Sequence, residues 1–233
     1  MDKNHSHKFK KHGNYLVCEC GAKRLTYKNV DGKRVGMRAN GMKYTRKANI
    51  NRFLFPNEYK ILDDGLNTRM RYCFRFLFNT GGRIDEISKV DLDKDFIFNP
   101  KGRSHLIIRH TKTKAKKGEF EQGKPRDIPL SRQFAKYLNM HRGIKFCSKP
   151  ALGIAMKKLG VNMKMQDPSD FSAHTLRKTF EVWLMAMGVN DLPLCAHLGH
   201  TPGTAASNYI SPEVFSWQDK KVMRAIIGDI YEH

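Results

Sequence analysis

The sequence predicts an α+β fold that is mainly α-helical and contains one small antiparallel β-sheet. Apolar residues recur at helical spacing in 58–66 and 67–78, which indicates two amphipathic helices. Residues 95–130 then change to short apolar runs separated by turn residues, a pattern typical of three strands. From residue 131 onward the apolar spacing is again helical, and no internal repeat interrupts this order.

The first two predicted helices lead to a pair of glycines. Leu62 and Phe74 represent the apolar faces of these two helices. Gly81 and Gly82 are expected to end the second helix, because glycine is unfavourable inside helices. A new element is predicted over 83–90.

The predicted sheet consists of Phe96–Phe98, His105–Arg109 and Arg126–Leu130. Asn99–Gly102 forms a turn between the first two strands, and a loop rich in Lys and Gly joins the last two. Further helices are predicted over 131–142, 150–159, 173–187, 191–198, 203–210 and 214–230.

The chain is strongly basic. Its 233 residues suffice for one sizeable core, or for one domain with a small appendage. It has 43 Lys and Arg against 22 Asp and Glu, and 14 of these basic residues, with only three acidic ones, lie in 1–55. Such a charge favours polyanion partners, above all nucleic acid.

Five cysteines, an odd number without the spacing of a disulfide framework, indicate a reducing compartment. The N-terminus lacks the apolar segment of a signal peptide, and no apolar run reaches the roughly 18 residues of a membrane span. We therefore expect a cytoplasmic protein without a membrane partner.

Residues 1–55 are predicted to form a basic arm. Tyr15–Cys18 and Leu25–Tyr27 have strand propensity, and Asp31 with Gly32 forms a hairpin turn signal. A small β-ribbon is consistent with this segment.

The arm also contains weak candidates for zinc ligands, namely His7, His12, Cys18 and Cys20. The Cys-x-Cys spacing is not the usual two-residue spacing of zinc sites, and no second Cys pair follows. We therefore predict no metal, and the alternative is a basic, disordered arm that contains histidines.

Two histidines, an arginine and a tyrosine follow one another at short intervals in the C-terminal half. His174 and Arg177 are three residues apart in a helix and therefore share one face. Gly199 is expected to end the next helix, as Gly188 ends this one, because glycine adopts the left-handed conformation. His200 follows directly, and Tyr209 lies on the helix after it. By helical phase His197 points away and is expected to be structural.

These residue types suit attack on a phosphodiester. A tyrosine with a pKa near 10 is only about a thousandth ionised at pH 7, so a base or a positive field must assist it. The attack places charge on the non-bridging oxygens, and the loss of one donor to such oxygens typically costs roughly 3–4 kcal/mol. The leaving 5′ oxygen needs a proton donor, and Lys112 is the best candidate.

The set resembles the tyrosine recombinase (phage integrase) family, whose catalytic domain carries Arg, Lys, His-x-x-Arg, Leu-Gly-His and Tyr in this order. The match covers about 56–215, and Thr80–Glu86 carries the Thr-Gly-x-Arg-x-x-Glu opening of the family. The 26 residues from His174 to His200 and the nine from there to Tyr209 are also typical.

The resemblance implies a DNA strand transferase that acts through a 3′-phosphotyrosyl intermediate, with no cofactor, metal or ATP. Tyr209 is the implied nucleophile. The implied phosphate ligands are Arg83, Arg177 and His200, with His174 assisting proton transfer, Lys112 protonating the 5′ oxygen and Glu86 orienting the arginines.

The assignment of the proton donor stays open, because Lys112 shares its loop with three further lysines. Those lysines and the arginine before the loop are predicted to contact DNA: Lys114, Lys116, Lys117 and Arg109.

The resulting division is a basic arm over 1–55, a tyrosine recombinase catalytic domain over 56–213 and a C-terminal helical tail over 214–233. The implied partner is double-stranded DNA, bound by a homotetramer on two sites. The amphipathic tail either packs on its own domain or docks onto a neighbouring protomer. Family members usually carry an N-terminal helical domain that completes a clamp around DNA, and 1–55 does not resemble a helical bundle.

The sequence therefore predicts a site-specific recombinase or integrase of a mobile element, a virus or a chromosome-dimer system. A type IB topoisomerase or hairpin resolvase shares the chemistry but rejoins strands differently. A non-catalytic DNA-binding relic is the alternative from another class, although a binder has no need of Tyr209. A zinc-ribbon regulator would leave residues 56–233 unexplained.

Overall fold

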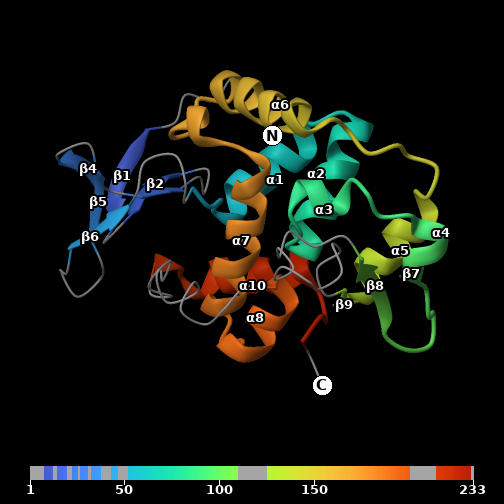
Figure 1. Cartoon of the computed structure of the whole chain (residues 1–233). Helices are drawn as coiled ribbons and strands as arrows, with labels where there is room; N and C mark the ends of the chain where they lie inside the picture. Colours follow the sequence, from blue (N-terminus) through green and yellow to red (C-terminus); the bar gives the residue numbers. More distant parts are fainter. Residues whose placement is uncertain are drawn as a thin grey trace, which may run out of the picture.

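The structure is a computed structural model, shown in Figure 1. It describes residues 8–12, 15–19, 23–25, 27–30, 33–37, 43–46, 52–109, 125–199 and 214–231. The predicted helix over 203–210 and the Lys/Gly-rich loop lie outside these residues.

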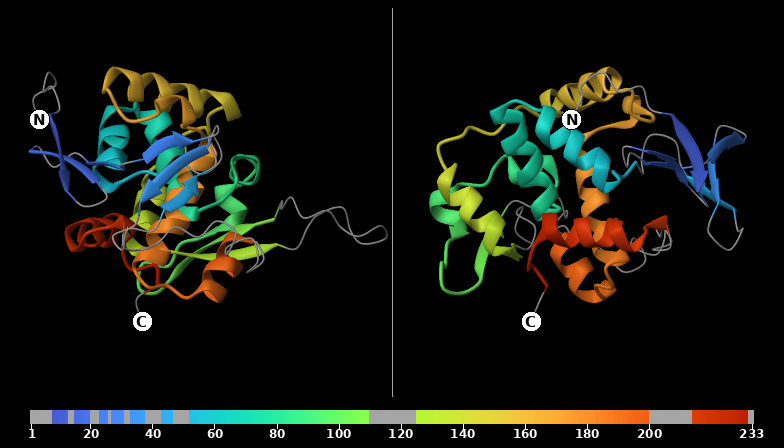
Figure 2. Two further views of the ribbon diagram at one scale, coloured as in Figure 1. Left: turned by 90° about the vertical axis from the view of Figure 1, so that its left-hand side faces the viewer. Right: turned by 180° about the vertical axis from the view of Figure 1, so that it is seen from behind.

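The N-terminal segment contains two antiparallel sheets of three strands each. The first consists of β1 (Phe9–His12), β2 (Tyr15–Cys18) and β3 (Lys23–Leu25), and the second of β4 (Tyr27–Val30), β5 (Lys33–Met37) and β6 (Lys43–Arg46). Val30 pairs with Lys33 across the predicted hairpin turn. Both sheets lie on one side of the helical part (Figures 1 and 2). They exceed the single ribbon that the sequence predicts, because several of these short strands are polar and lack apolar alternation.

The rest of the described chain is mainly helical. Its helices are α1 (Pro56–Gly65), α2 (Thr68–Thr80), α3 (Ile84–Ile87), α4 (Leu92–Asp95), α5 (Arg132–Met140), α6 (Lys149–Asn162), the 3₁₀ turn η1 (Pro168–Asp170), α7 (Ala173–Ala186), α8 (Asp191–Leu198) and α10 (Trp217–Ile227). In Figure 1, α7 runs through the centre of this part, with α6 near one end and α8 near the other. The prediction of a mainly helical α+β fold is confirmed.

The predicted antiparallel sheet is formed by β7 (Phe96–Ile97), β8 (Ser104–Ile108) and β9 (Arg126–Leu130), in that order. In β8 and β9 buried residues alternate with more exposed ones, since successive side chains of a strand point to opposite faces. Ile128 and Leu130 of β9 face the core, and Arg126 has the same phase.

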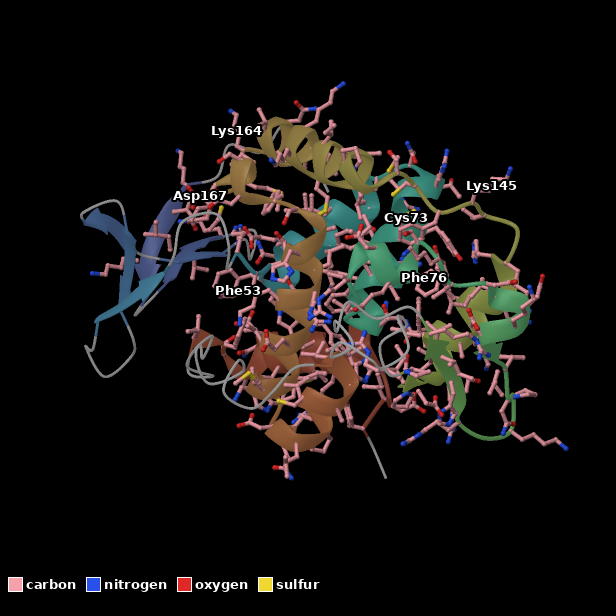
Figure 3. The ribbon with its side chains drawn as sticks, viewed as in Figure 1. Phe53, Cys73, Phe76, Lys145, Lys164 and Asp167 are labelled. Carbon is pink, nitrogen blue, oxygen red and sulfur yellow. The ribbon has the colours of Figure 1, made fainter. Side chains whose placement is uncertain are left out.

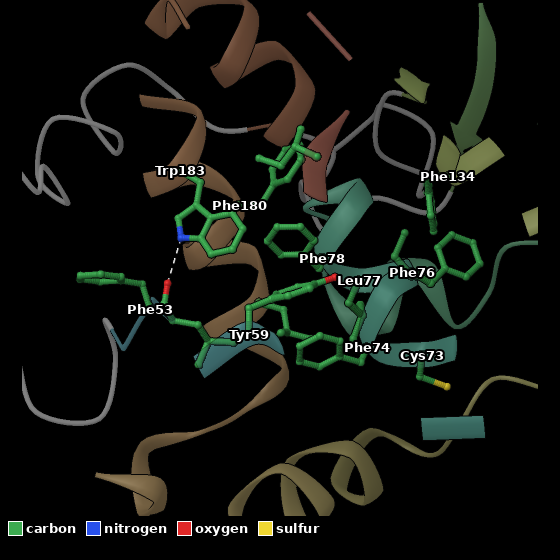
Figure 4. Packing of buried hydrophobic residues seen from close by; sticks show 14 of the residues in the cluster. Phe53, Tyr59, Cys73, Phe74, Phe76, Leu77, Phe78, Phe134, Phe180 and Trp183 are labelled. Atoms are coloured by element: carbon green, nitrogen blue, oxygen red, sulfur yellow. Dashed lines mark hydrogen bonds between the residues drawn. The ribbon is translucent and has the colours of Figure 1, made fainter. Parts of the chain in front are cut away.

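An aromatic cluster between α1, α2 and α7 forms the centre of the core (Figure 4). Tyr59, Phe78 and Trp183 pack with ring centroids 4.5–5.5 Å apart. The indole N–H of Trp183 donates to the carbonyl of Leu54 at 2.9 Å, so this buried polar group is satisfied. Phe53, Leu54 and Phe55, which the sequence assigned to the arm, thus belong to the core.

The C-terminal segment packs on the same core. Val214, Phe215, Met223 and Ile227 are buried in it. Ser216 begins α10 with a capping box, in which Ser216 and Asp219 hydrogen-bond each other's backbone N–H groups. Of the two alternatives left open for the tail, the described residues show packing on its own chain.

Helix α6 is positioned by contacts of the segment before it with α2. The backbone N–H of Cys147 donates to the sulfur of Cys73 at 3.0 Å, and Arg69 donates to the carbonyls of Lys145 and Phe146. Figure 3 labels Cys73 on α2 and Lys145 in this segment. These contacts fix the start of α6.

Within the described ranges, no helix combines the length and the apolar character that crossing a bilayer requires.

Candidate active site

A pocket of about 460 Å³ lies between the start of α3, the first half of α6 and the start of α7. Arg83, His174 and Arg177, three of the residues predicted from the sequence, all line it. Lys157 of α6 and Asp85 of α3 are further charged residues in its wall. The fold therefore brings Arg83 to the face of α7 that carries the His-x-x-Arg pair.

The chain reaches Arg83 through a tightly fixed turn. Gly81 ends α2 in the left-handed conformation with φ of 56°, and a Cβ there would lie 2.6–2.7 Å from side-chain atoms of Leu198 and Phe180. The Nε2–H of His197 donates to the carbonyl of Thr80 at 3.0 Å. The predicted helix end at Gly81 is confirmed, and both the backbone conformation and the close packing require glycine.

His197 is fully enclosed, in agreement with its predicted structural role. Burial lowers the pKa of His197 to about 4, and the adjacent arginines act in the same direction, so the ring is neutral at pH 7. In that form His197 hydrogen-bonds the end of α2 and does not line the pocket.

Arg177 is buried, yet both of its acceptors in the described chain are backbone carbonyls. Its Nη1 donates to Gly81 at 2.8 Å and its Nη2 to Leu198 at 2.7 Å. Burial, followed by the nearby charges of Arg83 and Arg126, lowers the pKa of Arg177 to about 10. The guanidinium therefore remains protonated at pH 7 and is held in place without a neutralising carboxylate.

Arg83 precedes α3 and is paired with Glu86 in its first turn. The Nη1 of Arg83 lies 2.8 Å from one Glu86 oxygen, and its backbone N–H donates to the other at 3.2 Å. Burial alone would raise the pKa of Glu86, but the charge of Arg126 and the hydrogen bonds from Arg83 lower it overall. Glu86 is thus a carboxylate in direct contact with Arg83, and its orienting role stays a prediction.

His174 lies in the first turn of α7 and lines the pocket, and its side chain is exposed in part to solvent. Desolvation by its surroundings and the charge of Arg177 lower the pKa of His174 below its ordinary value. Its imidazole is therefore neutral at pH 7 and can accept a proton.

The sequence reasoning missed Arg126, which contacts two parts of the site. Its Nη2 lies 2.6 Å from Glu86, and its Nη1 donates to the carbonyl of Leu198. The signal was present in the predicted strand, because Arg126 has the inward phase of Ile128 and Leu130. A charged residue on the core-facing side of a strand indicates a buried partner.

Arg109, predicted to contact DNA, is placed at the end of β8, where its Nε lies 2.5 Å from a carboxylate oxygen of Asp95. It is not among the described residues that line the pocket. The remaining predicted site residues lie outside the described part of the chain: Lys112, Lys114, Lys116, Lys117, His200 and Tyr209.

Of the weak zinc candidates, His7 and Cys20 also lie outside the described residues. Cys18 is a buried residue of β2, and His12 ends β1. Within the described ranges no group of three or more His, Cys, Asp or Glu side chains could hold a metal ion.

No family model matches the chain, and neither does any curated protein sequence. Solved structures of recombinases are similar to it. One is the XerH site-specific recombinase bound to a palindromic difH substrate in a post-cleavage complex, with a TM-score of 0.52 and 16% identity over 79% of this chain and 54% of that one. Another is the XerA recombinase, with a TM-score of 0.51 and 19% identity over 74% of this chain and 64% of that one.

The described chain thus has the fold of a tyrosine recombinase catalytic domain. It spans about half to two thirds of the length of these two proteins. At such identities the likeness concerns the fold, and the chemistry must be argued from the site.

Proposed function

We propose that this protein is a site-specific DNA recombinase that cleaves and rejoins strands through a 3′-phosphotyrosyl intermediate. The observation that carries the proposal is the shared pocket of Arg83, His174 and Arg177. It combines two guanidinium groups with a neutral imidazole on the fold that recombinases use.

The charge of the pocket fits a phosphodiester. Arg83, Lys157 and Arg177 supply three positive charges to its described wall, against the one carboxylate of Asp85. Arg177 has carbonyl acceptors instead of a carboxylate, so its charge is available to an anion. Arginine suits this role, because its planar fork binds two phosphate oxygens at once.

In the proposed reaction the hydroxyl oxygen of Tyr209 attacks the scissile phosphorus, and the bond from phosphorus to the 5′ oxygen breaks. Arg83, Arg177 and His200 stabilise the charge on the non-bridging oxygens. His174 takes part in transfer of the tyrosine proton, and Lys112 protonates the leaving 5′ oxygen.

Rejoining reverses these steps. The 5′ hydroxyl of a second strand attacks the phosphotyrosine and releases Tyr209, so the bond energy is conserved. In the proposed assembly, a homotetramer on two DNA sites provides the two pairs of strands.

DNA bound in this way would extend beyond the pocket. Lys157 and the exposed side chain of Ile154 line the pocket from α6, so we expect α6 to lie next to a duplex that has one phosphate at Arg177. We expect the affinity for DNA to fall steeply with salt, because the basic side chains of a protein with a net charge of +21 displace counterions condensed on the DNA.

The test uses DNA substrates nicked near each candidate cleavage point, taken from a library of host and element junctions. Wild type is expected to form a covalent adduct in EDTA that survives denaturant, and Tyr209→Phe is expected to form none. Tyr137→Phe is the matched control, because Tyr137 packs against Phe134 and Arg75 away from the pocket and its loss should leave the adduct intact.

DNA binding without an adduct across the library would contradict the enzymatic proposal and favour a non-catalytic DNA-binding protein. An assay with supercoiled plasmid distinguishes the proposed recombinase from a type IB topoisomerase. Relaxation by the protein alone, without exchange between sites, would indicate a type IB topoisomerase.

A further inference from the structure

We propose that Arg126 is a positioning residue for strand cleavage, which sets Arg83 and the end of α8 at Leu198 and Gly199 relative to each other. This inference rests on the proposed function and adds a residue to its site. It follows from two contacts of one guanidinium with parts of the chain that are distant in sequence.

The first contact is an ion pair with Glu86, 40 residues earlier in the chain. The Nη2 of Arg126 lies 2.6 Å from the Glu86 oxygen that also accepts the backbone N–H of Arg83. The side chains of Glu86 and Arg126 are only 2% and 10% exposed, so water screens this pair weakly. Glu86 is therefore held from one side by Arg83 and from the other by Arg126.

The second contact is with the end of α8, 72 residues later in the chain. The Nη1 of Arg126 donates to the carbonyl of Leu198, which also accepts from Arg177 at 2.7 Å. Leu198 and Gly199 lead directly into His200, the proposed phosphate ligand. The guanidinium of Arg126 thus connects Glu86, which contacts Arg83, to the carbonyl of Leu198, which lies two residues before His200.

Gly199 permits this contact. It ends α8 in the left-handed conformation with φ of 66°, and a Cβ at this position would overlap the guanidinium of Arg126. Two features of the structure therefore favour glycine in Leu-Gly-His: the positive φ and the close approach of Arg126.

The geometry of the guanidinium is essential to the role. Its two Nη atoms reach a carboxylate and a carbonyl at the same time, which the single ammonium group of lysine cannot reproduce with the same spacing. Arg126 is not among the residues that line the pocket, so it is expected to act through Glu86 and Leu198 and not on the phosphate.

The test compares Arg126→Gln and Arg126→Lys with wild type, using Arg132→Gln as the control. Arg132 is an exposed residue nearby that pairs with Asp229, so its loss removes the same charge without touching the site. On the nicked substrate at saturating DNA, Arg126→Gln is expected to slow adduct formation roughly 10- to 100-fold, as misplacement of catalytic groups does. The dissociation constant for DNA should stay within about threefold of the control value, since a positioning residue does not contact the phosphate.

Two further comparisons separate positioning from general loss of structure. Arg126→Lys should recover part of the cleavage rate, and combining Arg126→Gln with Glu86→Gln should slow cleavage less than the product of the single effects. An unchanged rate, or weaker DNA binding with an unchanged rate at saturation, would overturn the inference.

A measurement without DNA distinguishes this failure from failure of the proposed function. Amide hydrogen exchange in 83–86 and 195–199 should be faster in Arg126→Gln than in Arg132→Gln. If wild type forms no adduct, the proposed function fails, and unchanged exchange in these two segments would then reject the positioning contacts as well.

Discussion

Substituting Arg177 by glutamine is expected to abolish most of the cleavage activity while changing the free energy of unfolding by less than about 2 kcal/mol. The burial of Arg177, with the nearby charges of Arg83 and Arg126, lowers its pKa from 12.5 to about 10. At about 1.4 kcal/mol per pKa unit, its charge costs the folded state roughly 3 kcal/mol, and a neutral side chain removes that cost.

Lost hydrogen bonds oppose this gain. The carbonyl of Gly81 loses its donor, and that of Leu198 keeps the one from Arg126. An unsatisfied buried polar group costs about 1–3 kcal/mol, which is similar to the gain and opposite in sign. The two effects therefore nearly cancel.

Arg52 is the matched comparison, because it is also a buried arginine. Its guanidinium contacts both oxygens of Glu58, and the two side chains are 3% and 4% exposed. Arg52→Gln leaves the Glu58 carboxylate buried without its partner, a change that typically costs about 3–5 kcal/mol. We therefore expect Arg52→Gln to be clearly less stable than Arg177→Gln.

Urea unfolding measures both values, and the buried Trp183 provides a fluorescence signal. In parallel, adduct formation with the nicked substrate should fall by two to three orders of magnitude in Arg177→Gln, as expected for a lost donor to the transferring phosphate. If Arg177→Gln were destabilised as much as Arg52→Gln, Arg177 would be a structural residue. Our explanation of its charge would then be wrong.

Three further substitutions test the surroundings of the site. The lowered pKa keeps His197 neutral in the folded chain, whereas the unfolded chain binds a proton between pH 6.5 and 4, so this histidine lowers the free energy of unfolding by roughly 3 kcal/mol over that range. His197→Gln should therefore flatten the pH dependence of the free energy of unfolding there. An unchanged profile would contradict this assignment. The pKa of Glu86 is lowered in the folded state, so its carboxylate stabilises the fold at pH values above the ordinary pKa of a glutamate. This stabilisation is lost as the pH falls through the lowered pKa, so the melting temperatures of wild type and Glu86→Gln should converge in acid. Gly199→Ala should destabilise the fold more than Gly188→Ala, because both glycines have positive φ but a Cβ meets Arg126 at position 199 and nothing within 4 Å at position 188; equal urea midpoints would argue against the contact.

The elements with local signals were predicted well. Gly81, Gly188 and Gly199 end helices in the structure as expected, since a left-handed residue after a helix is a property of a few neighbouring positions. The three strands of the sheet were likewise found from short apolar runs between turns. The N-terminal sheets were only partly foreseen, because polar strands such as β6 have no apolar alternation.

The site was predictable where its members are close in sequence. His174 and Arg177 share a helical face by spacing alone, whereas Arg83 was connected to them through the family resemblance. The contacts of Arg126 with Glu86 and of His197 with Thr80 span 40 and 117 residues, and no local periodicity encodes them. They arise from the packing of β9 and α8 against the turn after α2.

The charges around the pocket differ from those elsewhere in the core in a way that favours an anionic ligand. Buried charges are normally paired with opposite charges, as Arg52 is with Glu58. Near the pocket Glu86 is shared by Arg83 and Arg126, and Arg177 is held by carbonyls. A phosphodiester at this position would supply the negative charge that the described side chains lack. Under the proposed function, a bound phosphate would offset the unfavourable burial of the Arg177 charge, which is why we expect the substitution of Arg177 to affect cleavage more than stability.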